Sequence, residues 1–251
     1  MILITNDDGI NAIGLRKLHE AMSEIDRSVV VAPETEQSAV GHAITLSKPL
    51  KIREVVEDGK LFGHAVNGTP ADCVKMALTS ILPELPQLVV SGINHGGNFG
   101  SCVIYSGTVS AAREATMMGV SAVAFSLDTW EEPDFTVSTK FAKRFIPQVL
   151  ERGLPQGIAL NVNIPAVPKS EISGAVFTHQ SKTRVIEAFQ KRVDPRNNAY
   201  YWMEGEIEWD YSQKGSDSSM LNKGYISITP IHHDLTHYKT LEELRDWKVR
   251  F

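Results

Sequence analysis

The chain opens with Ile2-Leu3-Ile4-Thr5-Asn6-Asp7-Asp8-Gly9, and this stretch indicates the fold of the whole N-terminal part. Four apolar or β-branched residues that run into Asn, Asp and Gly are typical of a buried strand ending in a tight turn. In an open α/β sheet, ligands bind in the crevice outside the carboxyl ends of the strands. Two adjacent carboxylates repel each other there unless a cation neutralises them, and a hard divalent cation suits carboxylate oxygens. The alternative is that one aspartate caps the next helix while the other faces water.

The composition is that of an ordinary globular protein. Its 251 residues are enough for one large domain or for a core with an appendage, and hydrophobic residues make up 42%. The formal charge of −5 argues against a nucleic-acid partner, which would need a strongly basic face. No apolar run of 18 residues and no basic leader occurs, so we expect a cytoplasmic protein without a membrane partner. Cys73 and Cys102 are too few for a disulfide framework and are expected to be buried free thiols.

Strand-like and helix-like segments alternate from Ile2 to about Pro165. This order predicts an α/β fold with a mostly parallel, doubly wound, Rossmann-like sheet. After the first strand, the expected strands are Val29–Pro33, a hairpin of Ile44–Arg53 and Leu61–Val66, Leu88–Val90, Val120–Leu127, and Ile158–Ile164. The expected helices are one capped by Asn11, one from Thr69 to Ile81, one from Ser106 to Met118, and one around Phe141–Val149.

Beyond Pro165 the pattern changes to a β-rich region, and we expect two parts: a core, 1–165, and a C-terminal region with a terminal helix, 166–251. Thr183–Val193 and Ala199–Met203 are strand-like and are joined by the turn Asp194–Asn198. This hairpin is basic on one side of the turn and aromatic beyond it. We expect it to pack on another subunit, although a solvated basic β-arm is the alternative.

Three of the expected strands end in groups suited to a metal ion. The first ends at Asp7 and Asp8, the second leads to Ser38, and the third leads to Asn94. If these strands lie side by side, two carboxylates, a hydroxyl and an amide oxygen converge on one point. Such an all-oxygen site suits Mg²⁺, Mn²⁺ or Ca²⁺. A zinc site would need His and Cys at ligand spacing, and the distant cluster of His232, His233 and His237 is expected to be solvated or structural.

A glycine-rich loop after the third strand favours an anion as ligand. Its glycines allow close approach of backbone N–H groups to a ligand; they are Gly92, Gly96, Gly97 and Gly100. Ser106-Gly107-Thr108 then supplies hydroxyls and free amides at a helix N-terminus, which is a ready site for phosphate. Glycines also make ordinary turns, so the loop favours phosphate only in combination with the acidic pair.

Two other enzyme classes fit the sequence poorly. Phosphatases that form an aspartyl-phosphate carry two aspartates separated by one residue after a first strand. Aligning Asp8 with the second of these puts Asn6 at the nucleophile position, and an amide is a poor nucleophile toward phosphorus. A nicotinamide-dependent oxidoreductase is disfavoured because no G-x-G-x-x-G follows the first strand.

Six motifs, taken together and in order, resemble the stationary-phase survival protein SurE family. They are Ile2–Gly9; Val30–Pro33 with Ser38; Asn67–Asp72; Ser91–Asn94 with Gly96, Asn98 and Gly100; Tyr105–Val109; and Ser227–Pro230 with Asp234 and Thr236. The resemblance spans nearly the whole chain. Gln37 departs from it where the family often has Arg, and Ser110 and Ala115 replace frequent glycines.

This resemblance implies a divalent-metal-dependent phosphatase that hydrolyses nucleoside 5′- and 3′-monophosphates and, in some members, short polyphosphate. The family's metal ligands fall on Asp7, Asp8, Ser38 and Asn94, one cation per subunit, with Mg²⁺ or Mn²⁺ expected. It also implies a homodimer or homotetramer that exchanges the C-terminal hairpin. The expected substrate-binding residues are Asn6, Gly96, Ser106, Gly107 and Thr108.

The expected reaction is phosphomonoester hydrolysis. A bound cation polarises a phosphoryl oxygen and lowers the pKa of a bound water. Asp8 is the candidate to orient or deprotonate that water, and Asp7 could take the same role. The alternative from another class is a non-catalytic, metal-dependent nucleotide sensor that uses the same site.

Overall fold

The computed structural model describes residues 1–249 and is built around one sheet of nine strands. The strand order is β3-β4-β2-β1-β5-β6-β7-β11-β8. The bounds are β1 Ile2–Thr5, β2 Ser28–Pro33, β3 Ile52–Glu57, β4 Lys60–Val66, β5 Leu88–His95, β6 Ala122–Asp128, β7 Ala159–Pro165, β8 Gly174–Phe177 and β11 Tyr225–Ile231. Neighbours from β4 to β7 are parallel, whereas β3 pairs with β4, and β11 with β7, in antiparallel register. The expected α/β class with a mostly parallel sheet is confirmed.

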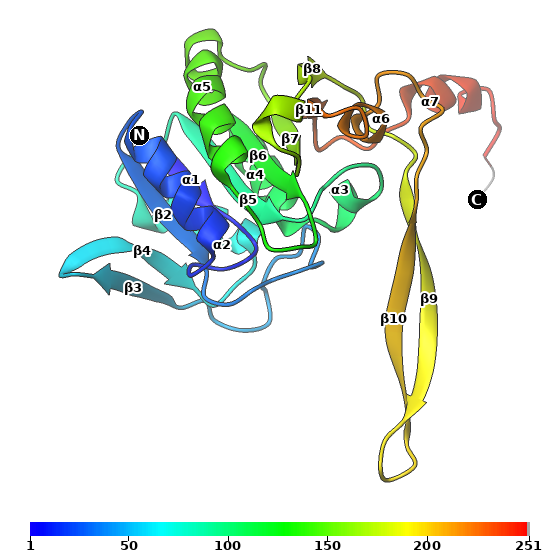
Figure 1. Ribbon diagram of the computed structural model, residues 1–251, viewed down its shortest axis with the longest axis horizontal. Helices are drawn as coiled ribbons and strands as arrows, with labels where there is room; N and C mark the ends of the chain where they lie inside the picture. Colours follow the sequence, from blue (N-terminus) through cyan, green and yellow to red (C-terminus); the bar gives the residue numbers. More distant parts are fainter. Residues whose placement is uncertain (250–251) are drawn as a thin grey trace.

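Helices cover both faces of this sheet (Figure 1). One face carries α1 (Ile13–Ser23) and α5 (Thr136–Arg152), and their apolar side chains share one core cluster with β1 and β5. The other face carries α2 (Pro70–Met76) and α4 (Gly107–Met117) over a second cluster. The short helices are α3 (Cys102–Tyr105), α6 (Asp217–Leu221), α7 (Tyr238–Leu244), η1 (Ala77–Ile81) and η2 (Lys169–Glu171). The core is therefore a three-layer sandwich whose central strands are buried on both faces.

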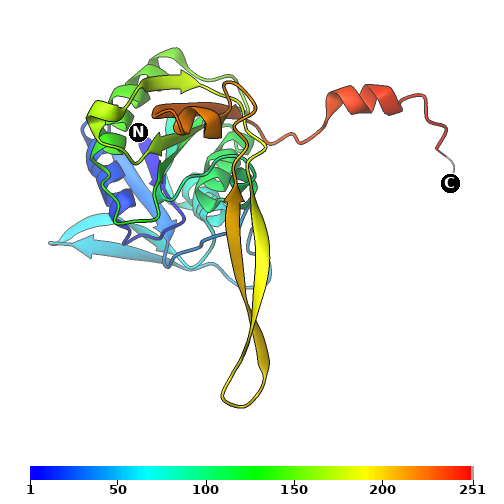
Figure 2. The same cartoon turned by 45° about the vertical axis from the view of Figure 1, so that its right-hand side comes forward.

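The C-terminal region is joined to the core sheet, because β11 pairs with β7 and β8 pairs with β11. From it projects a long antiparallel hairpin of β9 (Arg184–Val193) and β10 (Ala199–Glu208). Figures 1 and 2 show that the hairpin extends away from the body of the molecule. Figure 2 shows that α7 also lies away from the body. The expected hairpin and its turn are confirmed, and the second strand runs five residues further than Met203.

Three local expectations are wrong. Asn11 does not cap α1; the N-cap is Ala12, which has extended backbone angles and a backbone N–H bound to the carbonyl of Gly9. The strand expected from Ile44 begins only at Ile52. The helix that starts after Thr69 changes at residue 77 into a turn of wider π-helix, in which the N–H of Leu82 reaches back to Ala77.

Two further observations concern the rest of the chain. None of the helices within residues 1–249 is long and apolar enough to cross a membrane. In the late histidine cluster, the His237 ring accepts a hydrogen bond from the backbone N–H of Thr240 and so caps α7. That histidine has the structural role expected of the cluster.

Candidate functional site

The ends of β2, β1 and β5 meet at one edge of the sheet. β1 lies between the other two strands and is parallel to both, with Ile4 opposite Val30 on one side and Val90 on the other. The three strands thus lie side by side, which is the condition under which their ends were expected to form one site. The chain order reverses at β1, because β2 follows on one side of it and β5 on the other. This reversal makes the edge a topological switch point, where open α/β sheets bind their ligands.

Asp7 lies buried at the N-terminus of α4. The hydroxyl of Thr108 donates to its carboxylate, and the backbone N–H groups of Thr108 and Gly107 add further hydrogen bonds. Burial raises the pKa of Asp7, and these hydrogen bonds offset only part of the increase. A Cβ atom at Gly107 would lie 2.6 Å from the Cβ of Asp7, so the close approach requires glycine. The helix terminus expected to receive phosphate thus holds the Asp7 carboxylate in this structure.

Asp8 is half-buried beside Asp7. Burial and the charge of Asp7 raise the pKa of Asp8 to about 7, and the charge of Glu36 acts in the same direction. A hydrogen bond from the backbone N–H of His95 opposes the shift. The two carboxylates are therefore held in an environment that disfavours two negative charges, and a cation at this place would relieve it.

Ser38 and Asn94 approach the pair from either side. The backbone N–H of Gln37 donates to the carbonyl of Asp7 at 2.8 Å, which places the loop of Ser38 against the end of β1. The exposed Ser38 hydroxyl donates to Oε1 of Glu36 at 2.5 Å. Asn94 lies at the end of β5, next to the residue that bonds Asp8, and its Nδ2 donates to the carbonyl of Gly96 at 2.7 Å. The structure brings the loop of Ser38 and the strand end of Asn94 to the acidic pair.

The donor set fits a hard divalent cation. It consists of oxygen atoms from two carboxylates, a hydroxyl and an amide, which are the ligands that Mg²⁺ and Mn²⁺ prefer. Within residues 1–249 no group of three His, Cys, Asp or Glu could hold a metal ion, and the candidate set contains only two acids. Buried polar oxygens without a hydrogen-bond partner in the described residues also lie at the end of β1 and on β5 beside it: Thr5 Oγ1, Asn6 Oδ1 and Ser91 Oγ. Such atoms are unusual in a protein interior and are consistent with a polar ligand or water at this edge.

The remaining expected phosphate-binding residues surround the same edge. Ser106 caps α4, because its hydroxyl accepts a hydrogen bond from the N–H of Val109 at 3.1 Å. Gly96 has a φ of +117°, which favours glycine in the loop after β5. The Asn6 side chain is buried and donates to the carbonyl of Gly9 at 3.0 Å, so it shapes the turn that carries the two aspartates.

Known proteins of one family are similar to this chain over most of its length. A family profile described as "Survival protein SurE" matches residues 2–187. The chain belongs to the SurE family. It is 47% identical to the 5′-nucleotidase SurE of Syntrophobacter fumaroxidans over 248 residues, covering 99% of each chain. The corresponding protein of Syntrophus aciditrophicus is 49% identical over 97% of this chain and 92% of its own. The crystal structure of the SurE protein from Aquifex aeolicus superposes with a TM-score of 0.84 at 40% identity, covering 97% and 98% of the two chains.

In this SurE family member the glycine loop is fixed by a buried polar network that sequence reasoning missed. The backbone N–H of Asn98 donates to Oδ1 of Asn163 at 2.7 Å, and its carbonyl accepts from the amides of Asn161 and Asn163. The side chain of Asn98 donates to Ser126 Oγ at 2.8 Å. These partners belong to β6 and β7, so the two strands beyond β5 hold the glycine loop in position at the sheet edge. Paired asparagines two residues apart on a buried strand are the signal that could have revealed this network.

The C-terminal region anchors the same loop. Asp217, buried at the start of α6, accepts hydrogen bonds from the backbone N–H groups of Gly100 and Ser181. A Cβ atom at Gly100 would lie 2.2 Å from the carbonyl of Thr183 at the base of the hairpin. Phe99 also stacks on Trp209 with ring centroids 5.1 Å apart. The base of the hairpin is therefore in direct contact with the loop at the candidate site.

A long loop without helix or strand, residues 34–51, carries Ser38 and crosses the face of α2 and α4; we call it the strap. His42 on the strap bonds the buried carboxylate of Glu114 on α4 at 2.8 Å, and Lys75 on α2 bonds the same carboxylate. Asp72 binds the strap by accepting from both the N–H and the hydroxyl of Thr45, at 3.0 and 2.6 Å. Two buried carboxylates thus hold the loop that bears a candidate metal ligand.

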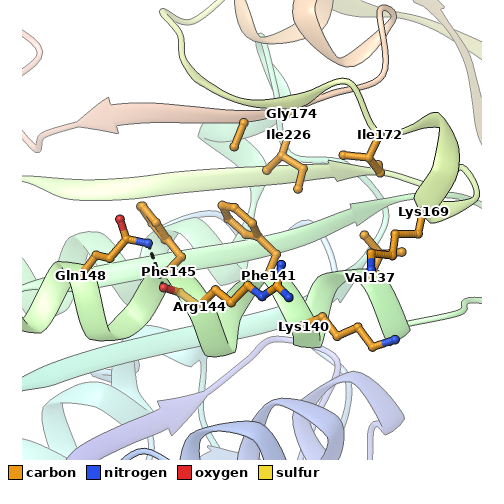
Figure 3. A pocket seen from close by; sticks show the side chains of 11 residues that line it. Val137, Lys140, Phe141, Arg144, Phe145, Gln148, Lys169, Ile172, Gly174 and Ile226 are labelled. Carbon is orange, nitrogen blue, oxygen red and sulfur yellow. Dashed lines mark hydrogen bonds between the residues drawn. The ribbon is translucent and has the colours of Figure 1, made fainter.

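A separate cavity of about 410 Å³ lies away from this edge, between α5 and the strands β8 and β11 (Figure 3). Phe141 and Phe145 form its apolar side, and the cations Lys140, Arg144 and Lys169 border it. None of the expected site residues lines it. The candidate site is therefore the sheet edge and is separate from this cavity.

Proposed function

We propose that the chain hydrolyses nucleoside 5′- and 3′-monophosphates with a divalent cation held by Asp7, Asp8, Ser38 and Asn94, and that short-chain polyphosphate is a further substrate. The observation that carries the proposal is the placement of two adjacent carboxylates at the switch point of the sheet, against the N-terminus of α4. Mg²⁺ or Mn²⁺ is the proposed cation, one per subunit.

The enzyme class is supported by full-length relatives. Proteins named 5′-nucleotidase SurE align with 97–99% of this chain at 47–49% identity. The chain is accordingly a phosphatase of the 5′-nucleotidase class. The metal used, the action on 3′-phosphates and the action on polyphosphate are proposals that go beyond this class.

The two aspartates are proposed to have different roles because their surroundings differ. A bound cation would polarise a phosphoryl oxygen and lower the pKa of a water ligand. Asp7 is buried and held by Thr108 and the N-terminus of α4, so with a cation bound it would be a negative charge fixed in position. Asp8 is more exposed than Asp7, so it is the group proposed to orient the attacking water and accept its proton.

The residues around the pair are proposed to bind the phosphoryl group. Gly96 would allow the loop backbone to approach the phosphoryl group closely. The N–H of Gly107, with the hydroxyls of Ser106 and Thr108, would stabilise negative charge on the equatorial oxygens. Thr108 and the helix terminus now bond Asp7. We propose that substrate shares these donors with Asp7 when a cation compensates the additional charge. Asn6 keeps the turn between them in place.

We further propose that the hairpin mediates a homodimer or homotetramer. Its strands are exposed along nearly their whole length, and many large apolar side chains lie on them: Ile186, Phe189, Val193, Tyr200, Tyr201, Trp202 and Met203. The register places Ile186, Tyr200 and Trp202 on one face of the hairpin and the others on the opposite face. Exposed apolar side chains in this number mark an interaction site. A second subunit would remove them from water.

The experiment is a phosphate-release panel on the purified protein. AMP, 3′-AMP and tripolyphosphate are each incubated with Mg²⁺, with Mn²⁺ and with EDTA. We expect release of inorganic phosphate from both nucleotides with a metal and none with EDTA. Asp8→Asn, purified identically, is the matched control for contaminating phosphatase and should lose about 10²-fold or more in rate, because a positioned charged group typically contributes that much.

Two outcomes would contradict the proposal. AMP that binds in the presence of metal without release of phosphate would indicate a nucleotide sensor. Near-normal turnover by Asp8→Asn with metal still bound would exclude the role given to Asp8.

A further inference from the structure

Trp130 lies at the rim of the candidate site and is not used by the reaction described above. It belongs to the loop of residues 129–135 between β6 and α5, and 77% of its side chain is exposed. Its ring nevertheless packs over the glycine loop. A Cβ atom built on Gly96 would lie 3.5 Å from Cη2 of the indole and 3.7 Å from Nδ2 of Asn94. The indole and a candidate metal ligand therefore border the same point.

The loop that carries Trp130 is held on both sides of the ring. Nε2 of His95 donates to the carbonyl of Glu131 at 2.8 Å, and the N–H of Gly96 donates to the carbonyl of Leu127 at 2.9 Å. Further along, Phe135 is only 6% exposed and packs into the core. A single exposed tryptophan on a protein surface needs no explanation. This one is fixed beside the reaction centre with a free aromatic face, which reduces the entropy lost when a ligand binds.

The residues around Trp130 indicate which part of the substrate would bind there. In a nucleotide the base lies one sugar away from the phosphate, so a phosphate at the sheet edge directs the base outward. Trp130 is followed by Glu131 and Glu132, whose charges disfavour a second phosphate but not a neutral base. Aromatic side chains bind bases by stacking and tolerate any base, because every base presents a π-face.

We propose that Trp130 is the base-binding residue of this enzyme, a platform on which the purine or pyrimidine ring stacks while the phosphate occupies the metal site. The inference rests on the proposed nucleotidase function and specifies its substrate recognition. It predicts a preference for nucleotides over sugar phosphates without strong discrimination among bases.

The experiment compares AMP with ribose 5-phosphate, which has the same phosphate and sugar but no base. For Trp130→Ala we expect KM for AMP to rise about tenfold or more, as stacking on an aromatic side chain typically contributes, with kcat and the kinetics of ribose 5-phosphate nearly unchanged. Trp130→Phe should retain most of the affinity for AMP. Trp247→Ala, at a tryptophan that is 70% exposed near the C-terminus, is the matched control and should behave as the parent.

Adenosine supplies a readout that does not depend on phosphate binding. It should inhibit ribose 5-phosphate hydrolysis by the parent competitively and should inhibit Trp130→Ala about tenfold less well. An equal loss for AMP and ribose 5-phosphate would show that the ring only supports the loop, and no loss for either would show that it is idle; both overturn the proposal. A change of sedimentation coefficient in Trp130→Ala would instead identify a subunit contact and also overturn it. If the parent hydrolyses neither substrate, the proposed function fails, which is a separate result.

Discussion

At the scale of single residues, several carboxyl groups at the sheet edge have surroundings that favour the protonated, neutral form. Asp7 and Asp8 are two of them, and Asp128 at the end of β6 is a third. Burial raises the pKa of Asp128 to about 6. A Cβ atom at Gly97 would lie 2.8 Å from Oδ1 of Asp128, so the carboxyl packs directly under the glycine loop. Its ionisation is therefore linked to the stability of the fold.

The sign of this linkage predicts that the folded protein loses stability as the pH rises. The folded state binds a proton at Asp128 more tightly than the unfolded chain, whose carboxyl has its ordinary pKa of 3.8. The stability that protonated Asp128 contributes is thus fully present below pH 4 and is lost as the pH rises through about 6. The free energy of unfolding should fall by on the order of 2–3 kcal/mol, at 1.36 kcal/mol per pKa unit. Asp128→Asn stays neutral and should become the more stable protein as the pH rises from 4.5 to 7.5.

The measurement for this prediction is urea unfolding of both proteins in EDTA across that pH range. The difference in free energy of unfolding between parent and Asp128→Asn cancels the other titrating groups they share. Asp246→Asn, at an exposed carboxyl, is the control and should give a constant difference. A constant difference for Asp128→Asn as well would show that burial of this carboxyl does not affect stability.

At the scale of elements, local sequence predicted those parts of the fold whose causes are local. The helix after Thr69 starts as expected because the Thr69 side chain bonds the N–H of Asp72, while the Asp72 carboxylate bonds the N–H of Thr69. The strands that end at the site were identified from apolar runs closed by turn residues. Their adjacency was a condition of the predicted site and was not predicted by itself. The pairing of β1 with β2 and with β5 meets that condition.

The strap could not be predicted because its order comes from contacts distant in sequence. Ile44 and Leu46 alternate as in a strand, yet both are exposed. Their neighbours instead bond tertiary partners: the N–H of Thr45 donates to Asp72, and the carbonyl of Ala43 accepts from the hydroxyl of Thr69. The Asn98 network and the contact between Gly100 and Thr183 are equally long-range. Loops of this length without regular structure are uncommon and are usually functional.

The strap yields a prediction about Glu114. Burial alone would raise the pKa of its carboxyl, but hydrogen bonds from His42 and Lys75 hold that pKa below its ordinary value, so the group is ionised and attached to both. Glu114→Gln should destabilise the fold by about 1–3 kcal/mol, as loss of hydrogen bonds to a charged group typically does. It should also loosen residues 39–50, which hydrogen exchange of the strap amides measures directly.

A control for Glu114→Gln is Glu20→Gln, which removes an exposed ion pair with Lys17. Such surface pairs contribute little, so neither stability nor exchange should change appreciably. Strap amides that remain as protected in Glu114→Gln as in the parent would mean that this carboxylate does not hold the loop. In that case the two hydrogen bonds that Thr45 donates to Asp72 would be sufficient to hold it.

At the scale of the whole molecule, the hairpin of β9 and β10 projects far beyond the body that carries it (Figure 2). Phe189 and Trp202 are 68% and 58% exposed, and the sheet of β9 and β10 contains only these two strands. An isolated two-stranded hairpin is at best marginally stable in water. Its base, however, is tied to the glycine loop through Thr183 and Asp217. A partner subunit that orders the hairpin would therefore also support the catalytic edge.

The strand pairing of the hairpin shows which residues can be deleted so that the remaining parts of β9 and β10 stay paired. Such a deletion tests whether the hairpin mediates assembly. Phe189 pairs with Met203, so removal of residues 192–202 leaves Gln190 and Lys191 as a two-residue turn between paired positions. Gln190→Asn and Lys191→Gly in the same variant supply the residues that such turns favour. We expect this variant to sediment as a monomer, whereas Arg196→Ala, at the exposed turn, should keep the mass of the parent oligomer.

Sedimentation velocity over a range of concentrations separates the possible results. A deletion variant that keeps the parent mass would refute assembly through the hairpin and leave it as a solvated arm. A monomer that has also lost AMP hydrolysis, while its unfolding transition stays cooperative, would extend the conclusion. Assembly would then act on catalysis through Gly100, since the N–H of this residue and its contact with Thr183 join the hairpin base to the loop of Asn94.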